Sequence, residues 1–149
     1  MNCGLTAPEM YLDTSVAVKL FIPEPDSDEC ELIVGGNGFF SSELLIAELW
    51  AAALSKERGG HIRATDRERM WLHFESMLGD GSIQLVPLNG IVIREVTEVM
   101  SEVHPHMPLR TLDAIHLATY LSVDAGPLFT RDKRMLEAAR RLNIPLAGV

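Results

Sequence analysis

The chain has 149 residues, 47% of them hydrophobic, which is enough for the core of one compact domain. A formal net charge of −8 argues against a protein that coats nucleic acid through a broad basic surface. No stretch reaches the ~20 apolar residues of a membrane span, and Cys3 and Cys30 lack metal-site spacing, so we expect a cytoplasmic protein with free thiols.

Short apolar runs alternate with longer helical patterns from the start of the chain. The first two helices have recognisable limits, because serine or aspartate precedes them and glycine follows them. Hydrophobic residues recur at helical spacing within the helices, as expected of helices that pack on a sheet. In chain order, the first half predicts a strand over residues 10–13, a helix over 26–36, a strand over 38–42 and helices over 42–60 and 64–81.

The second half continues the same alternation. It predicts a strand over residues 82–88, helices over 91–103 and 111–123, a strand over 126–130, a helix over 132–143 and an edge strand over 144–148. Thr111 is the expected cap of its helix. Strands that alternate with helices imply a mainly parallel sheet with helices on both faces, a three-layer α/β/α fold. We expect one domain over residues 1–149, with residues 1–8 as a loose N-terminal extension.

Two aspartates follow predicted strands. Asp13 ends the first strand, and Asp132 comes shortly after the strand over residues 126–130. In a parallel sheet the carboxyl ends of the strands share one edge, where ligands bind, so both carboxylates belong to the same edge. Taken alone, Asp13 is more simply explained as a cap for a short helix over residues 16–21.

Two further acids stand at unusual places in predicted helices. Glu48 interrupts a helix that is apolar almost all round, where an unpaired carboxylate would be costly unless that position is exposed. Asp113 lies in the first turn of its helix, where the helix dipole alone would favour an acid. Both positions therefore allow a functional and a purely structural interpretation.

A divalent cation would explain why these four acids occur together. Four unneutralised carboxylates in one pocket repel one another, and at least one would stay protonated at neutral pH. Mg²⁺ or Mn²⁺ prefers oxygen ligands, bridges to substrate phosphates and activates water for phosphodiester cleavage. The four acids are Asp13, Glu48, Asp113 and Asp132.

Four short blocks carry these acids in order: YLDTSVAVKLF, SSELLIAELWAA, LRTLDAIHLATYL and LFTRDKRML. Together they resemble the sequence blocks of PIN-domain ribonucleases, above all the VapC-type toxins of prokaryotic toxin–antitoxin pairs. The resemblance runs from residue 10 to the C-terminus. It implies an Mg²⁺- or Mn²⁺-dependent endoribonuclease of a type II toxin–antitoxin module, with the four acids as catalytic metal ligands. It also implies a protein antitoxin and a homodimer as partners.

Residues beside the acids are candidates for binding RNA. The resemblance matches Thr130 to a hydroxyl residue before the fourth acid, and Thr14 and Ser15 to small hydroxyls after the first. Thr14 or Ser15 is also expected to cap the helix after Asp13. Basic residues outnumber acids in residues 105–149, which predicts a small positive rim with phosphate contacts from Arg110 and Arg131.

Several alternatives remain open from the sequence. His116, one turn after Asp113, is either a metal ligand or general base, or a hydrogen-bonded core histidine. Trp50 and Trp71 favour a core or dimer interface over base stacking. The whole chain is alternatively a non-catalytic PIN fold, or a receiver-like Mg²⁺-binding signalling module, although a receiver would need a second acid where Thr14 stands.

Overall fold

The protein was analysed as a computed structural model that describes residues 9–123 and 126–149. The predicted extension over residues 1–8 lies outside the described residues. The elements follow the predicted chain order. They are β1 (Tyr11–Leu12), α1 (Thr14–Ala17), the 3₁₀ turn η1 (Val18–Leu20), α2 (Ser27–Val34), β2 (Phe39–Ser42), α3 (Leu44–Arg58), α4 (Ala64–Gly79), β3 (Ile83–Val86), α5 (Gly90–Val103), α6 (Thr111–Leu121), β4 (Leu128–Phe129) and α7 (Lys133–Arg141).

The four strands form one parallel sheet in the order β3-β2-β1-β4. Tyr11 is in register with Phe40 on one side and with Leu128 on the other. The prediction of an edge strand over residues 144–148 is wrong, because this segment contributes only an isolated bridge between Leu128 and Leu146. Pro145 has no backbone N–H, so it cannot extend the hydrogen-bond ladder.

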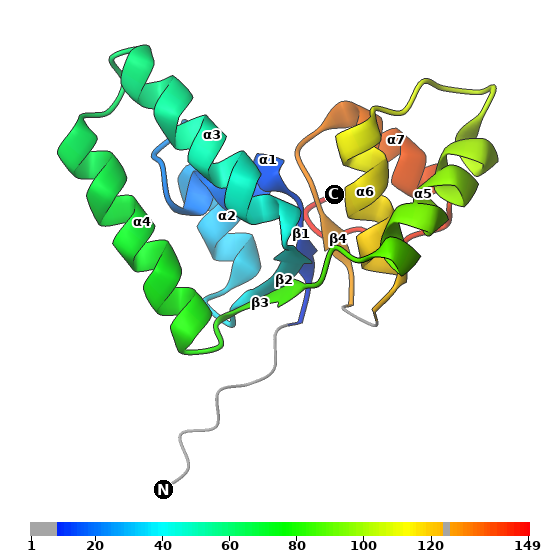
Figure 1. Cartoon of the computed structure of the whole chain (residues 1–149), viewed down its shortest axis with the longest axis horizontal. Helices are drawn as coiled ribbons and strands as arrows, with labels where there is room; N and C mark the ends of the chain where they lie inside the picture. The colour runs from blue at the N-terminus through cyan, green and yellow to red at the C-terminus, as the bar shows by residue number, and fades with distance from the viewer. Residues whose placement is uncertain (1–8, 124–125) are drawn as a thin grey trace, which may run out of the picture.

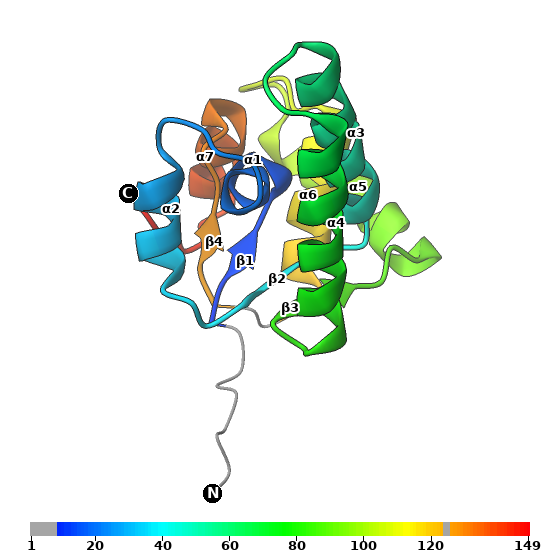
Figure 2. The same ribbon diagram turned by 90° about the vertical axis from the view of Figure 1, so that its left-hand side faces the viewer.

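Helices cover both faces of the sheet. Figure 1 shows α1 to α4 on the left of the strands and α5 to α7 on the right, and Figure 2 shows the strands side by side between them. Successive residues of a strand point to opposite faces. Tyr11 accordingly packs with the α5–α7 core, and Leu12 packs with the α1–α4 core. The predicted three-layer α/β/α fold is confirmed.

Two predicted helix caps are wrong. Asp13 occupies the N-cap position of α1, so Thr14 and Ser15 lie inside the helix instead of capping it. Arg110 occupies the N-cap position of α6, which makes Thr111 the first helical residue. Within the described residues, no helix combines the length and apolar character needed to cross a bilayer.

Candidate active site

Asp13 lies at the carboxyl end of β1 and is only 4% exposed. Its Oδ1 accepts a hydrogen bond from Ser15 Oγ at 2.6 Å, and its Oδ2 accepts one from Thr130 Oγ1 at 2.7 Å. Burial raises the pKa of Asp13, while these hydrogen bonds and nearby His116 act in the opposite direction. The fold thus buries a carboxylate and surrounds it with donors that favour its charged form.

The neighbouring strand β4 brings a second carboxylate to the same edge. Thr130 follows this strand, is 2% exposed, and accepts a hydrogen bond from the Asp132 backbone N–H at 3.1 Å. Asp132 is the N-cap of α7, and its Oδ1 accepts from the backbone N–H groups of Arg134 and Met135 at 2.8 and 3.0 Å. Thr130 therefore links Asp13 and Asp132 directly.

Asp113 comes to this edge from the first turn of α6. Its Oδ2 is buried and receives no hydrogen bond from any residue that the structure describes. Burial raises the pKa of Asp113, and the negative charges of Asp132 and Asp13 raise it further. The three aspartates are thus close enough for the charges of Asp13 and Asp132 to act on Asp113.

Glu48 reaches the site from α3, on the opposite helical layer to α6. Its side chain is 22% exposed, and Oε1 accepts hydrogen bonds from Thr14 Oγ1 at 2.7 Å and from His116 Nε2 at 2.6 Å. The side chain is therefore held against α1 and α6 and does not extend into bulk solvent. Its second oxygen, Oε2, receives no hydrogen bond within the described part of the chain.

The donor set of this site fits a hard divalent cation. All four acids offer carboxylate oxygens, and the buried Oδ2 of Asp113 lacks the partner that a buried polar atom requires. Across residues 9–123 and 126–149, no three His, Cys, Asp or Glu side chains stand close enough together to form a ready metal site. The candidate ligands Asp13, Glu48, Asp113 and Asp132 come from neighbouring elements, and their joint role in binding a cation stays a prediction.

The three hydroxyl residues predicted to bind substrate are hydrogen-bonded to carboxylates of the candidate site. Thr14 donates to Glu48, and Ser15 and Thr130 donate to Asp13. Ser15 Oγ also accepts from the backbone N–H of Arg131 at 2.9 Å. Their observed partners make them carboxylate-orienting residues, and contact with RNA stays a prediction for each.

Arg131 is turned away from the carboxylates towards α2. Its Nη2 lies 2.9 Å from Glu29 Oε2, its Nε lies 3.5 Å from Asp26 Oδ2, and the guanidinium stands over the Phe129 ring. The ion pairs are close, but their atoms are poorly aligned for hydrogen bonds. Arg131 therefore has acidic partners already, whereas Arg110 is exposed beside Asp113.

Sequence reasoning undervalued His116. Its ring is 2% exposed and hydrogen-bonded, as the core interpretation requires, but one of its partners is the site residue Glu48. The helical pattern puts His116 on the same helix face as Asp113, one turn later. It gives no information on the contact with Glu48, which is 68 residues away in the chain. The signal that was available is the spacing of Asp113 and His116 on one helix face.

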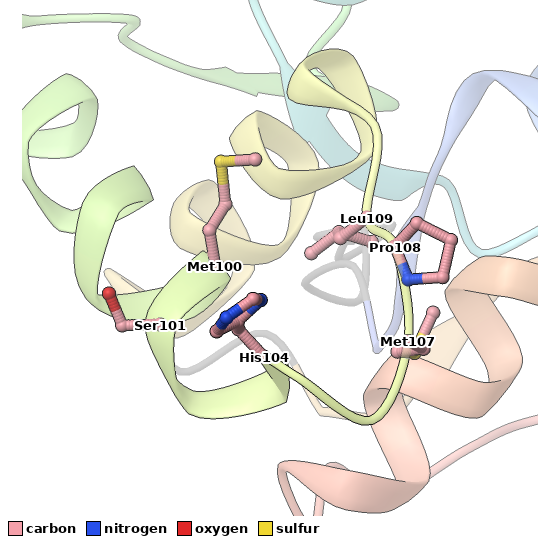
Figure 3. Close-up of a pocket in the computed structure, with 6 residues that line it drawn as sticks. All are labelled: Met100, Ser101, His104, Met107, Pro108 and Leu109. Atoms are coloured by element: carbon pink, nitrogen blue, oxygen red, sulfur yellow. The ribbon is translucent and has the colours of Figure 1, made fainter.

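A separate cavity of about 400 Å³ lies at the end of α5. Figure 3 shows His104 and Met100 facing Leu109 and Pro108 across it. None of the four acids lines this cavity, so it is distinct from the carboxylate cluster.

The aromatic residues of α3 and α4 form another surface feature. Trp50 and Trp71 pack edge to face with their ring centroids 4.7 Å apart. Together with Ile46 they line a shallow cavity. Leu72 on α4 is 68% exposed. Leu72 and the tryptophan pair both belong to the α1–α4 layer.

Comparisons with known proteins agree with this geometry. Residues 10–141 match the model of the PIN domain. The chain is also similar to a ribonuclease, VapC46 of Mycobacterium tuberculosis, with 36% identity over 138 residues. That alignment covers 91% of this chain and 93% of the relative.

Proposed function

The chain belongs to the PIN-domain family, and on that basis we propose that it is a metal-dependent endoribonuclease, the toxin of a toxin–antitoxin pair. The observation that best supports this activity is the gathering of carboxylates at the carboxyl edge of the parallel sheet, with Oδ2 of Asp113 buried and unpaired. The family membership expected from the four sequence blocks is confirmed. The receiver-like alternative is not favoured, because the match to the PIN domain spans residues 10–141.

We assign Asp13, Glu48, Asp113 and Asp132 as the residues that would hold Mg²⁺ or Mn²⁺. When bound, such a cation supplies positive charge and Lewis acidity for the hydrolysis of an RNA phosphodiester bond. Ser15 and Thr130 keep both oxygens of Asp13 oriented, and Asp132 is fixed by the first backbone N–H groups of α7. These contacts restrict the carboxylates before substrate arrives, which is the form of preorganisation that catalysis requires.

The RNA contacts belong to the basic residues around this cluster. Arg110, Lys133 and Arg134 are exposed beside the third and fourth acids, and we propose that they contact phosphates. Arg131 must first leave Asp26 and Glu29 to do so, and its contribution is therefore smaller. A protein of net charge −8 then holds RNA through few phosphate contacts.

Two protein partners are part of the proposal. The relative is named as a VapC ribonuclease. The resemblance to VapC-type toxins implies that a protein antitoxin pairs with this chain. We propose a cognate antitoxin for this chain and a homodimer formed through apolar residues of α3 and α4, among them Trp50, Trp71 and the exposed Leu72. A cytoplasmic location stays a prediction from the sequence.

RNA cleavage by purified protein tests the proposed activity. Total RNA incubated with Mg²⁺ or Mn²⁺ should yield discrete cut ends, and chelator should abolish them. Asp13→Asn and Asp113→Asn should also abolish cleavage, because each removes a charged ligand while keeping the side-chain shape.

Glu102→Gln is the matched control, since Glu102 is an exposed carboxylate on α5 and the substitution changes the net charge equally. It should cleave RNA as the native protein does. Undiminished cleavage in chelator, or by Asp13→Asn, would contradict the proposed function.

A further inference from the structure

His116 connects three residues of the site through its two ring nitrogens. Nδ1 lies 2.9 Å from the Tyr11 hydroxyl, and Nε2 lies 2.6 Å from Oε1 of Glu48 and 3.3 Å from Thr14 Oγ1. The ring is 2% exposed, and it packs edge to face against Tyr11. Both nitrogens are therefore occupied by protein groups, which leaves no lone pair for metal coordination.

The partners determine which nitrogen carries hydrogen. A carboxylate accepts hydrogen bonds and has none to donate, so the short contact to Glu48 requires a hydrogen on Nε2. This holds whether the ring is neutral or doubly protonated. In the neutral ring, Nδ1 then accepts the hydrogen of the Tyr11 hydroxyl.

The two oxygens of Glu48 are consequently unequal. Oε1 receives two donors, from His116 and Thr14, whereas Oε2 receives none within the described residues. A glutamate side chain has several rotatable bonds, and two directional bonds to one oxygen fix where the other oxygen lies. We propose that His116 is a positioning residue that holds Glu48 by Oε1 and so presents Oε2 to the divalent cation.

This contact also joins the two helical layers. Glu48 belongs to α3 of one layer, and His116 belongs to α6 of the other, one turn after Asp113. Helix α6 therefore carries one carboxylate of the site and orients another. The inference rests on the proposed function only in taking Glu48 as a metal ligand.

Two amide substitutions at His116 test the roles of the two ring nitrogens separately. In His116→Gln the side-chain amide nitrogen reaches the place of Nε2, so a donor to Glu48 is kept. In His116→Asn the amide lies near the place of Nδ1, so the donor to Glu48 is lost while a polar partner for Tyr11 is kept. The measurement is Mn²⁺ affinity of the full chain without RNA, by electron paramagnetic resonance.

We expect His116→Asn to weaken Mn²⁺ binding by about 10-fold or more, the usual effect of losing a residue that orients a metal ligand. His116→Gln should rescue most of this loss. His104→Asn, which changes an exposed histidine at the cavity of Figure 3, should bind Mn²⁺ as the native protein does. In a Glu48→Gln background, His116→Asn should cost no further affinity, because the residue through which it acts has been neutralised.

The outcomes separate this inference from the proposed function. If the native protein binds no Mn²⁺, both are overturned. If Glu48→Gln weakens binding and His116→Asn does not, only the positioning role is overturned. Equal losses in the native and Glu48→Gln backgrounds would show a general structural effect and would also overturn it.

A measurement on the native protein covers the case in which His116→Asn fails to fold. Nitrogen-15 spectra of the histidine rings report which nitrogen bears hydrogen. We expect hydrogen on Nε2 of His116 with and without Mg²⁺, and a shift of that resonance in Glu48→Gln. A bare Nε2 would overturn the inference.

Discussion

Removing the hydroxyl of Thr130 tests how the fold stabilises the buried carboxylate of Asp13. The hydroxyl donates to Asp13 Oδ2 at 2.7 Å and accepts from the Asp132 N–H at 3.1 Å, with 2% of the residue exposed. Thr130→Val replaces the hydroxyl by a methyl group of similar size. The change removes both bonds, together with a longer contact of 3.3 Å to Ser15 Oγ, and leaves the packing volume almost unaltered.

The cost follows from the charge of the acceptor. A hydrogen bond to a charged group contributes about 1.5–3 kcal/mol, and a neutral one about 0.5–1.5 kcal/mol. Losing both should lower the free energy of unfolding at pH 7 by about 2–4 kcal/mol. With an m-value of about 2 kcal/mol/M, the urea midpoint falls by about 1–2 M.

The loss should depend on pH. Burial already raises the pKa of Asp13, and removing the Thr130 bond, which favours the charged form, raises that pKa further. The stability that this bond contributes is present while Asp13 is ionised, and it declines as the pH falls through the pKa of Asp13 in the native fold. We therefore expect the difference between variant and native protein to shrink from pH 7 towards about pH 4.

Urea unfolding in chelator at both pH values provides the assay. Thr119→Val is the control, because Thr119 is also buried but its partners, the carbonyl of Ile115 at 2.7 Å and the Tyr11 hydroxyl, are neutral. Losing two neutral bonds should cost about 1–3 kcal/mol, and this cost should not change with pH. A Thr130→Val loss that is as constant with pH as that of Thr119→Val would refute the reasoning.

Three further predictions concern charge, RNA and assembly. Asp113→Asn should raise the free energy of unfolding of the metal-free protein at pH 7, because burial raises the pKa of this carboxyl and its charged form opposes folding. Below about pH 4 the substitution should have no such effect, and urea unfolding with no gain at pH 7 would contradict this. In an Asp13→Asn background, Arg110→Ala should lower RNA affinity and reduce the slope of log affinity against log salt concentration by up to ~0.7. Arg131→Ala should have a smaller effect on both. Equal effects of the two variants across a salt series would show that the ion pairs of Arg131 do not restrain it. The native protein should sediment as a dimer at micromolar concentration and Leu72→Glu as a monomer. Leu121→Glu, a change at another exposed leucine, on α6, should leave the dimer intact, and a monomeric native protein would exclude the proposed interface.

The order of the elements and the sheet edge that carries the site could be predicted from local patterns. Helical periodicity, glycine stops and strand-like runs are properties of neighbouring residues, and they placed Asp13 and Asp132 at one edge. Helix patterns also singled out Glu48 and Asp113, and the resemblance of the four blocks to PIN-domain ribonucleases implied one site for all four acids.

The contacts that orient the carboxylates could not be predicted, because they join residues far apart in the chain. Thr130 meets Asp13 across 117 positions, and Glu48 meets His116 across 68. Expecting Thr14 to cap a helix failed for the same reason, since its hydroxyl is taken by Glu48 on another helix. The direction of Arg131 depends on Asp26 and Glu29, whose distance from it along the chain gives no sign of the ion pairs.

Diffraction from crystals soaked in Mn²⁺ tests the central claim most directly. Anomalous differences locate the ion without assuming its ligands. A peak should appear among Asp13, Glu48, Asp113 and Asp132, with Oε2 of Glu48 turned towards it and Oε1 still hydrogen-bonded to His116. A peak at a different set of residues, or no peak in crystals of a protein that cleaves RNA with Mn²⁺, would contradict the claim.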